Sequence, residues 1–252
     1  MIETLVAQAD RLATEGQLEQ AKDLYIRICQ FAPHRARFWF RLAELQYKLE
    51  CFEDCQRALE YALRLEPFNP AILLLASVAL LETGHYAQVI QLADKILSLD
   101  GDKRLGALLN KSTALLRLGR FAEVLVTVDA VLESDNDQPM AHANRGAALT
   151  GLGRHEEALL AFERALQLRP GYGVVLINKS AVLRALRRPA EALTVADTAL
   201  TTHPTSPAAL LNRAALRAVG YNKNTPEPPG GIIERERNGE PSGLLIANPN
   251  AM

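Results

Sequence analysis

The sequence predicts an all-α protein: a right-handed superhelical solenoid of about six helix pairs, a capping helix, and a C-terminal tail that does not repeat. Two periodic markers carry this prediction. The first is a set of glycines, Gly16, Gly84, Gly119 and Gly153, whose numbers differ by 68, 35 and 34 in turn. The second is a set of prolines in two couples, Pro33 with Pro67 and Pro170 with Pro204, whose numbers differ by 34 in each couple. Because proline cannot continue a helix, each proline marks the end of one pair.

The second helix of every pair has a small or apolar residue followed by another apolar residue four positions later. Residues four apart lie on one face of a helix, so this spacing predicts one buried stripe per second helix. The couples are Ala21 with Tyr25, Cys55 with Leu59, Val89 with Ala93, Val124 with Val128, Ala158 with Phe162, and Ala192 with Ala196.

In chain order, the predicted repeat units are 2–35, 36–69, 70–104, 105–138, 139–172 and 173–206, followed by a capping helix at 207–220. The pattern has several departures, among them Pro189 after the turn at Arg187 and one extra residue in the unit 70–104. Glu50 and Arg187 replace the glycine between the two helices, and Gly101 and Asn136 replace the final proline. We expect these departures to loosen the local turns without changing the stacking, because each repeat is held by its neighbours. The solenoid domain therefore spans 1–220 and the tail 221–252.

This pattern resembles the tetratricopeptide repeat family over about residues 2–206, and most clearly over 139–172. There Gly146, Gly153, Ala158, Phe162 and Pro170 occupy the places of the family's small, turn, aromatic and proline residues. One helix pair cannot bury its apolar face alone, so pairs stack into a superhelix. The resemblance implies a concave groove lined by the first helix of each pair, where a partner would bind.

An asparagine recurs once per repeat in the first helices of the later units: Asn110, Asn144, Asn178 and Asn212. A primary amide donates and accepts hydrogen bonds, so a row of amides can match the backbone of an extended peptide. The row resembles the repeat domain of O-linked N-acetylglucosamine transferases, in which asparagines in this place line the inner surface and hold peptide. The alternative is that these amides bond between repeats and only stabilise the stacking.

A base follows each asparagine: Lys111, Arg145, Lys179 and Arg213. One interpretation is a basic stripe that binds acidic peptide termini, like the carboxylate clamp of some repeat domains. The clamp needs further bases on the following first helix, where this chain has Val174 and Asn178. We therefore favour solvated bases whose stems pack along the helix. Small and apolar residues are expected to share the groove face: Met140, Ala143, Ala147, Ile177 and Ala181.

The repeats offer no sign of catalysis. No glycine-rich phosphate loop, metalloprotease motif or nucleophile elbow occurs. Cys51 and Cys55 are four apart and could ligate a metal, but no second pair follows at zinc-site spacing, so Cys55 is more simply a core residue. The five histidines form no ligand spacing and are expected in turns or at the surface. The sequence therefore predicts no enzyme activity, no cofactor and no metal.

Charge and hydropathy narrow the partner class. The chain has 28 basic and 29 acidic residues, a net charge of −1, without a basic run that could neutralise a row of phosphates. Its longest apolar run, 71–81, is too short to span a bilayer. The first residues contain acids at helical spacing, unlike a signal peptide, and three cysteines suit a reducing compartment. We expect a cytoplasmic protein with a protein or peptide partner, and no nucleic acid or membrane.

The tail differs in composition. Residues 232–236 and 242–247 predict two short strands around Asn238-Gly239, a hairpin signal. The stretch from about 212 to 252 resembles a segment of the metal-dependent amidohydrolases, but it contains no histidine and so cannot supply that family's metal site. We interpret the tail as a remnant of a fusion or truncation. The alternative is that it folds back into the groove as a stand-in ligand.

Together these observations predict a non-catalytic interaction scaffold that binds an extended peptide or a partner protein in the concave groove. Two alternatives remain open. In the first, the chain is the substrate-recognition part of an O-linked N-acetylglucosamine transferase-like protein without its catalytic domain. In the second, which rests on the tail alone, it is an inactive remnant of an amidohydrolase fusion.

Overall fold

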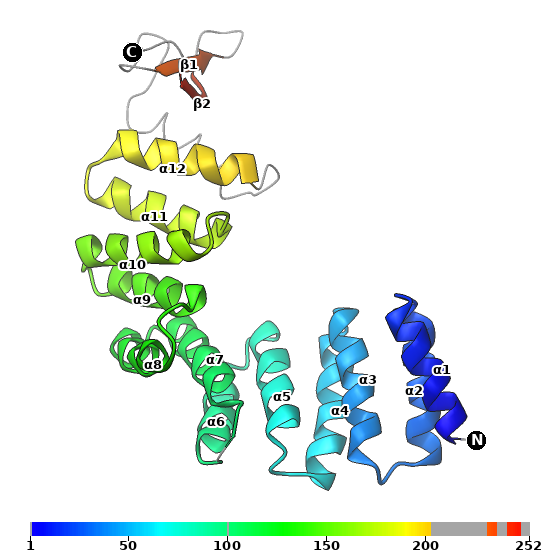
Figure 1. The fold of residues 1–252 in the computed structure, drawn as a ribbon. Helices are drawn as coiled ribbons and strands as arrows, with labels where there is room; N and C mark the ends of the chain where they lie inside the picture. Colours follow the sequence, from blue (N-terminus) through cyan, green and yellow to red (C-terminus); the bar gives the residue numbers. More distant parts are fainter. Residues whose placement is uncertain (1, 100, 203–230, 236–240, 248–252) are drawn as a thin grey trace. The chain divides into compact units, whose positions relative to one another are not determined.

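The computed structural model describes residues 2–99, 101–202, 231–235 and 241–247. The chain divides into two compact units, Met1–Val131 and Leu132–Met252, and each is described by itself. Within these described residues all regular structure up to 202 is helical, which confirms the all-α solenoid of helix pairs (Figure 1).

Unit 1 contains four successive helix pairs, the last of which runs across its boundary. These are α1 (Ile2–Thr14) with α2 (Leu18–Phe31), α3 (Ala36–Lys48) with α4 (Phe52–Leu65), α5 (Pro70–Glu82) with α6 (Tyr86–Leu97), and α7 (Arg104–Arg117) with α8 (Phe121–Ser134). Unit 2 contains two further pairs: α9 (Pro139–Gly151) with α10 (His155–Leu168), and α11 (Gly173–Ala185) with α12 (Pro189–Thr202).

The stripe predicted for the second helices is the core. Every member of the six couples is buried, from Ala21 and Tyr25 on α2 to Ala192 and Ala196 on α12. First helices contribute the facing side of this core, for example Phe38 on α3 and Val175 on α11. A spacing of four on each second helix is therefore enough to place these side chains inward.

The turn inside each pair needs a left-handed residue. Gly16, Gly84, Gly119 and Gly153 have φ of 80°, 79°, 71° and 74°, and Glu50 and Arg187 take the same conformation with φ of 58° and 57°. The turns at Glu50 and Arg187 also keep the hydrogen bond made at the glycine turns. The Cys51 amide donates to the Gln46 carbonyl at 2.9 Å, as the Arg154 amide donates to Leu149 at 2.8 Å. At Glu50 and Arg187 the expected loosening is wrong: the turn geometry is preserved and a non-glycine residue bears the strain.

In the tail, β1 (Gly231–Arg235) and β2 (Pro241–Ala247) pair antiparallel, with Ile232 opposite Ile246 and an irregularity between Ile233 and Arg235. The connecting residues 236–240 lie outside the described residues, so the Asn-Gly turn stays a prediction. The predicted capping helix at 207–220 also lies outside them.

Candidate peptide-binding face

The asparagines of the predicted row do not share one environment. On α7, Asn110 donates a hydrogen bond from Nδ2 to Oγ of Ser77 on α5, at 2.7 Å. Ser77 is fully buried and donates its own hydroxyl to the Leu74 carbonyl at 2.7 Å. The amide of Asn110 therefore joins two neighbouring first helices, which is the stacking role that the sequence left as the alternative.

At Asn178 on α11 the same arrangement cannot form. Ser77 stands two places beyond the asparagine position in the preceding repeat, and the residue at that place before Asn178 is Gly146, which has no side chain. Within the part of the chain that the structure describes, the Asn178 side chain makes no hydrogen bond and is partly exposed. Its donors and acceptor are therefore available to a ligand.

The remaining two asparagines differ again. Asn144 on α9 is 8% exposed, so neighbouring residues cover most of its side chain. Asn212, with the base Arg213, lies outside the described residues. Of the predicted row, Asn178 is thus the described member whose amide is both partly exposed and without an internal partner.

Two bases of the predicted stripe are held in ion pairs. Lys111 on α7 contacts Asp94 on α6 at 2.5 Å, and Lys179 on α11 contacts Glu163 on α10 at 3.0 Å. The two lysine side chains are only 23% and 16% exposed. Each pair links the second helix of one repeat to the first helix of the next, and both occupy the same places in the repeat. The sequence carried a signal for this, because each base of the stripe has an acid at a constant place on the second helix before it.

The exposed face of α11 around Asn178 is apolar. Val174 is 62% exposed, and Ala181 is also exposed, so the amide lies between apolar neighbours on one helix face, one turn to either side. On α9, Met140 is exposed as expected. Ala143 is buried, which corrects the expectation that it is exposed on the groove face.

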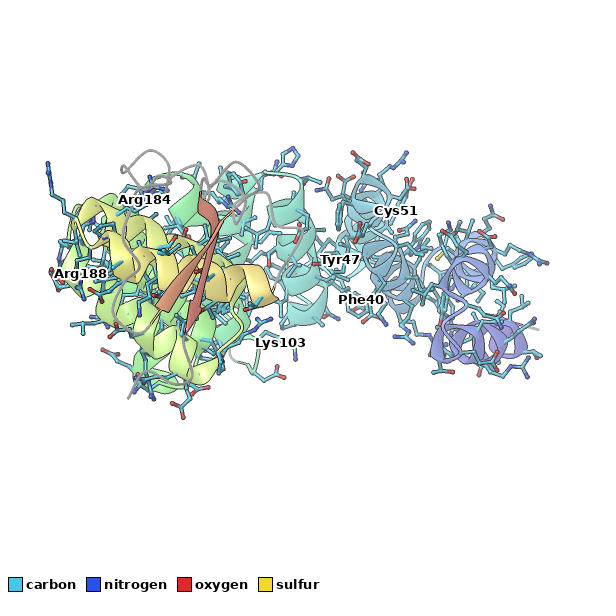
Figure 2. All side chains as sticks on the ribbon, turned by 90° about the horizontal axis from the view of Figure 1, so that it is seen from above. Phe40, Tyr47, Cys51, Lys103, Arg184 and Arg188 are labelled. Carbon is cyan, nitrogen blue, oxygen red and sulfur yellow. The ribbon has the colours of Figure 1, made fainter. Side chains whose placement is uncertain are left out.

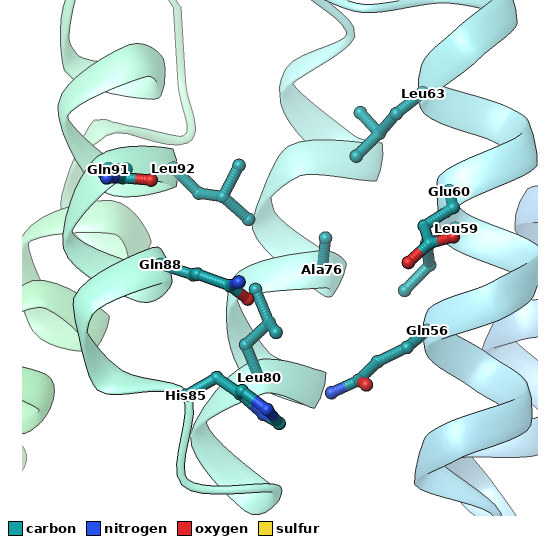
Figure 3. Close-up of a pocket in the computed structure, with 10 residues that line it drawn as sticks. All are labelled: Gln56, Leu59, Glu60, Leu63, Ala76, Leu80, His85, Gln88, Gln91 and Leu92. Atoms are coloured by element: carbon teal, nitrogen blue, oxygen red, sulfur yellow. The ribbon is translucent and has the colours of Figure 1, made fainter.

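A second feature, which the sequence did not predict, is a cavity of about 440 Å³ in unit 1 (Figure 3). We call it the α4–α6 cavity, because side chains of α4 and α6 face each other across α5. Its lining residues are Gln56, Leu59, Glu60 and Leu63 from α4, Ala76 and Leu80 from α5, and His85, Gln88, Gln91 and Leu92 at the start of α6 and along it.

The cysteines are arranged as structural residues. Cys55 is fully buried, and burial raises the pKa of its thiol to about 12; the same cause raises the pKa of Cys29 to about 12. Cys51, labelled in Figure 2, precedes α4 and its sulfur lies 3.6 Å from the Leu49 carbonyl oxygen. Among the described residues no three His, Cys, Asp or Glu side chains gather as a metal site would require.

One histidine departs from the expected turn or surface position. His142 lies inside α9, is buried, and its Nε2 is 2.9 Å from the Asn136 carbonyl oxygen. Because a carbonyl only accepts, Nε2 carries the proton and donates. The carbonyl of Asn136, the residue that replaces a proline, thus accepts a hydrogen bond from His142 on the first helix that follows it.

As for membranes, each helix in the described part of the chain is too short or too polar to cross a bilayer.

Comparison with known proteins supports the repeat assignment. The family model of the tetratricopeptide repeat matches residues 139–172. Among solved structures, a tetratricopeptide repeat protein from Parabacteroides merdae aligns with a TM-score of 0.76 at 15% identity, covering 88% of each chain. PilW, a type IV pilus biogenesis factor, aligns at 0.73 and 17% identity, covering 83% of this chain and 97% of its own.

A third solved structure, YrrB, is described as a tetratricopeptide repeat protein with an unusual peptide-binding site. It aligns with a TM-score of 0.55 at 18% identity, covering 75% of this chain and 97% of its own. At such identities these likenesses show the fold alone, and that fold is a stack of tetratricopeptide helix pairs.

The resemblance to amidohydrolases is confirmed only as a short match. A Bacillus subtilis protein named as a putative amidohydrolase, YtcJ, is 56% identical over 32 residues, which are 13% of this chain and 6% of that protein. The match therefore spans a small fraction of the amidohydrolase.

Proposed function

We propose that this chain, which has the fold of tetratricopeptide repeat proteins, is a non-catalytic scaffold that binds an extended segment of a partner protein along its first helices. Proteins of this fold are in general interaction scaffolds. The observation that carries the proposal is the Asn178 amide, which is partly exposed and has no hydrogen-bond partner among the described residues, between exposed Val174 and Ala181.

The chemistry of this face suits a peptide backbone. An amide donates and accepts at once, as the N–H and C=O of an extended chain require, and the apolar neighbours suit small or apolar side chains of the partner. A net charge of −1 favours a protein over a nucleic acid as the partner. Free cysteines, two of them buried, favour a reducing compartment such as the cytoplasm.

We propose different roles for the asparagines of the predicted row. We assign peptide contact to Asn178, keep Asn212 as a further member of the row, and assign the stacking role to Asn110; Asn144, at 8% exposure, offers a peptide little contact. One amide supplies about 0.5–1.5 kcal/mol net, so its removal should weaken binding about two- to tenfold.

The test is a peptide array probed with the wild type, with Asn178→Ala, and with Asn110→Ala as the matched control. We expect Asn178→Ala to lower the signal of bound peptides at an unchanged melting temperature. Asn110→Ala should lower the melting temperature and leave peptide binding intact below it. Unchanged binding by Asn178→Ala, together with a fall in stability, would contradict the proposal.

A further inference from the structure

The inter-repeat ion pairs show what normally occupies the junction between a second helix and the next first helix. Asp94 with Lys111 and Glu163 with Lys179 join these helices at identical repeat positions. In both pairs the lysine side chain is mostly covered, so its stem packs against the junction and its ammonium group meets the carboxylate. At two junctions, therefore, a lysine from the first helix packs its stem against the junction and pairs with an acid from the preceding second helix.

One junction has the acid without the lysine. Glu60 on α4 is the counterpart of Asp94 one repeat earlier, and Ala76 on α5 stands at the place of Lys111 once the residue inserted between the two repeats is allowed for. Within the described residues the Glu60 carboxylate makes no ion pair or hydrogen bond. The α4–α6 cavity lies at this junction and is lined by both Glu60 and Ala76.

The cavity has the lining that an alkyl ammonium side chain needs. Its apolar wall is Leu59, Leu63, Leu80 and Leu92, and the Glu60 carboxylate lies on the α4 side of the cavity (Figure 3). One end is fixed by a hydrogen-bond chain, in which Gln56 donates to Oγ1 of Thr83 at 2.5 Å and Thr83 lies 2.9 Å from Nδ1 of His85. The exposed amides of Gln88 and Gln91 on α6 remain to meet a peptide backbone.

We propose that the α4–α6 cavity binds a lysine side chain of a partner protein, which takes the place that the chain's own lysine takes at the other junctions. The ammonium group pairs with Glu60 and the stem lies against the leucines. The site is built from residues of α4, α5 and α6 and uses none of the residues assigned to peptide contact above, so it does not depend on the function proposed above.

The test compares two short peptides that differ only in charge: acetyl-Gly-Lys-Gly-amide and its norleucine counterpart, each titrated into the full chain and followed by amide NMR shifts. A charge-assisted hydrogen bond should make the lysine peptide bind about tenfold more tightly. The shifts are expected on α4, α5 and α6. Equal affinity of the two peptides, or shifts elsewhere only, would overturn the proposal.

Two variants sharpen the result. Glu60→Gln keeps the shape and removes the charge, so it should reduce the lysine peptide to the affinity of the norleucine peptide. Glu53→Gln, an exposed change on the same helix away from the cavity lining, is the matched control and should leave the affinity unchanged. An unchanged preference for lysine in Glu60→Gln would refute the role of the carboxylate.

Ala76→Lys supplies the missing lysine from within the chain. We expect it to raise the melting temperature and to abolish binding of both peptides, because the new side chain fills the cavity. Continued binding of the lysine peptide by this variant would place the site elsewhere. A third probe, butylamine, tests whether the natural ligand is a free amine or a lysine within a protein. If butylamine binds as tightly as the lysine peptide, the assignment to a protein segment is overturned.

Discussion

Gly146 on α9 lies directly beneath the ring of Phe162 on α10: a Cβ atom at Gly146 would stand 2.5 Å from Cε1 of that ring. Phe162 is fully buried, so the ring has little room to move. This contact explains why the repeat has glycine here where Ser77 stands in α5, and it leaves the Asn178 amide without the serine that Asn110 bonds. A packing requirement in the core of one repeat thus exposes a polar group on the next.

Gly146→Ala should destabilise unit 2. Overpacking costs about 1–3 kcal/mol, and the gain in helix propensity offsets about 1 kcal/mol of it, so we expect a net loss of up to about 2 kcal/mol in the free energy of unfolding. Urea unfolding followed by circular dichroism measures it. Adding Phe162→Leu to Gly146→Ala should cost less than the sum of the two single changes. Strict additivity would show that the ring is not the obstacle.

Glycine at the strained turns should stabilise the chain. Glu50 and Arg187 bear positive φ with exposed side chains that make no hydrogen bond or ion pair within the described residues. Relief of the left-handed strain outweighs the entropy of glycine, so Glu50→Gly and Arg187→Gly should each raise the free energy of unfolding by about 0.5–1 kcal/mol. Differential scanning calorimetry provides the measurement.

The matched control for those turns is Gly153→Ala. No atom lies within 4 Å of a Cβ added at Gly153, so the change introduces strain without a clash. It should lower stability by about 1 kcal/mol. A neutral result at Gly153, with no gain at Glu50, would mean that this turn tolerates any residue.

The bond between Asn110 and Ser77 should appear as coupling in a double-mutant cycle. Asn110→Ala removes one hydrogen bond and should cost about 1 kcal/mol, and the pair Asn110→Ala with Ser77→Ala should show a coupling energy of about 0.5–1.5 kcal/mol. Thermal unfolding of the four proteins gives the cycle. Absence of coupling would remove Asn110 from the stacking role and return it to the binding row.

Tyr25 should make stability depend on alkaline pH. Burial first, and then its hydrogen bond to Asp10 at 2.7 Å, raise the pKa of its hydroxyl from 10.0 to about 12. A raised folded-state pKa gives stability that is complete below pH 10 and is lost as the pH rises toward 12. The stability difference between wild type and Tyr25→Phe should therefore shrink over that range.

The measurement is urea unfolding of both proteins at a series of pH values from neutral to alkaline. At neutral pH the wild type should be the more stable by about 1 kcal/mol, the value of the lost hydrogen bond. Titration of Cys29 and Cys55 occurs in both proteins and cancels in the difference. A constant difference across the whole series would show that the Tyr25 hydroxyl does not ionise with unfolding.

Much of the fold was predictable because it depends on local rules. The spacing of glycine and proline indicated the helix ends, since one residue supplies the left-handed turn and the other cannot continue a helix. Couples of apolar residues four positions apart, such as Ala158 with Phe162, predicted that the second helices carry the core. The turns at Glu50 and Arg187 show the limit of this reasoning: neighbouring helices hold the turn geometry even where the local residue opposes it.

The period, the helix pairs and the buried stripe can thus be read from the chain, because each follows from residues a few positions apart. Which polar groups are occupied emerges only when the repeats are stacked. Asn110 and Asn178 are equivalent in the repeat, yet the first meets Ser77 and the second follows Gly146. Glu60 and Asp94 are equivalent too, yet only Asp94 receives a lysine. These partners come from the adjacent repeat, far away along the chain, so their identity depends on how one helix pair packs on the next.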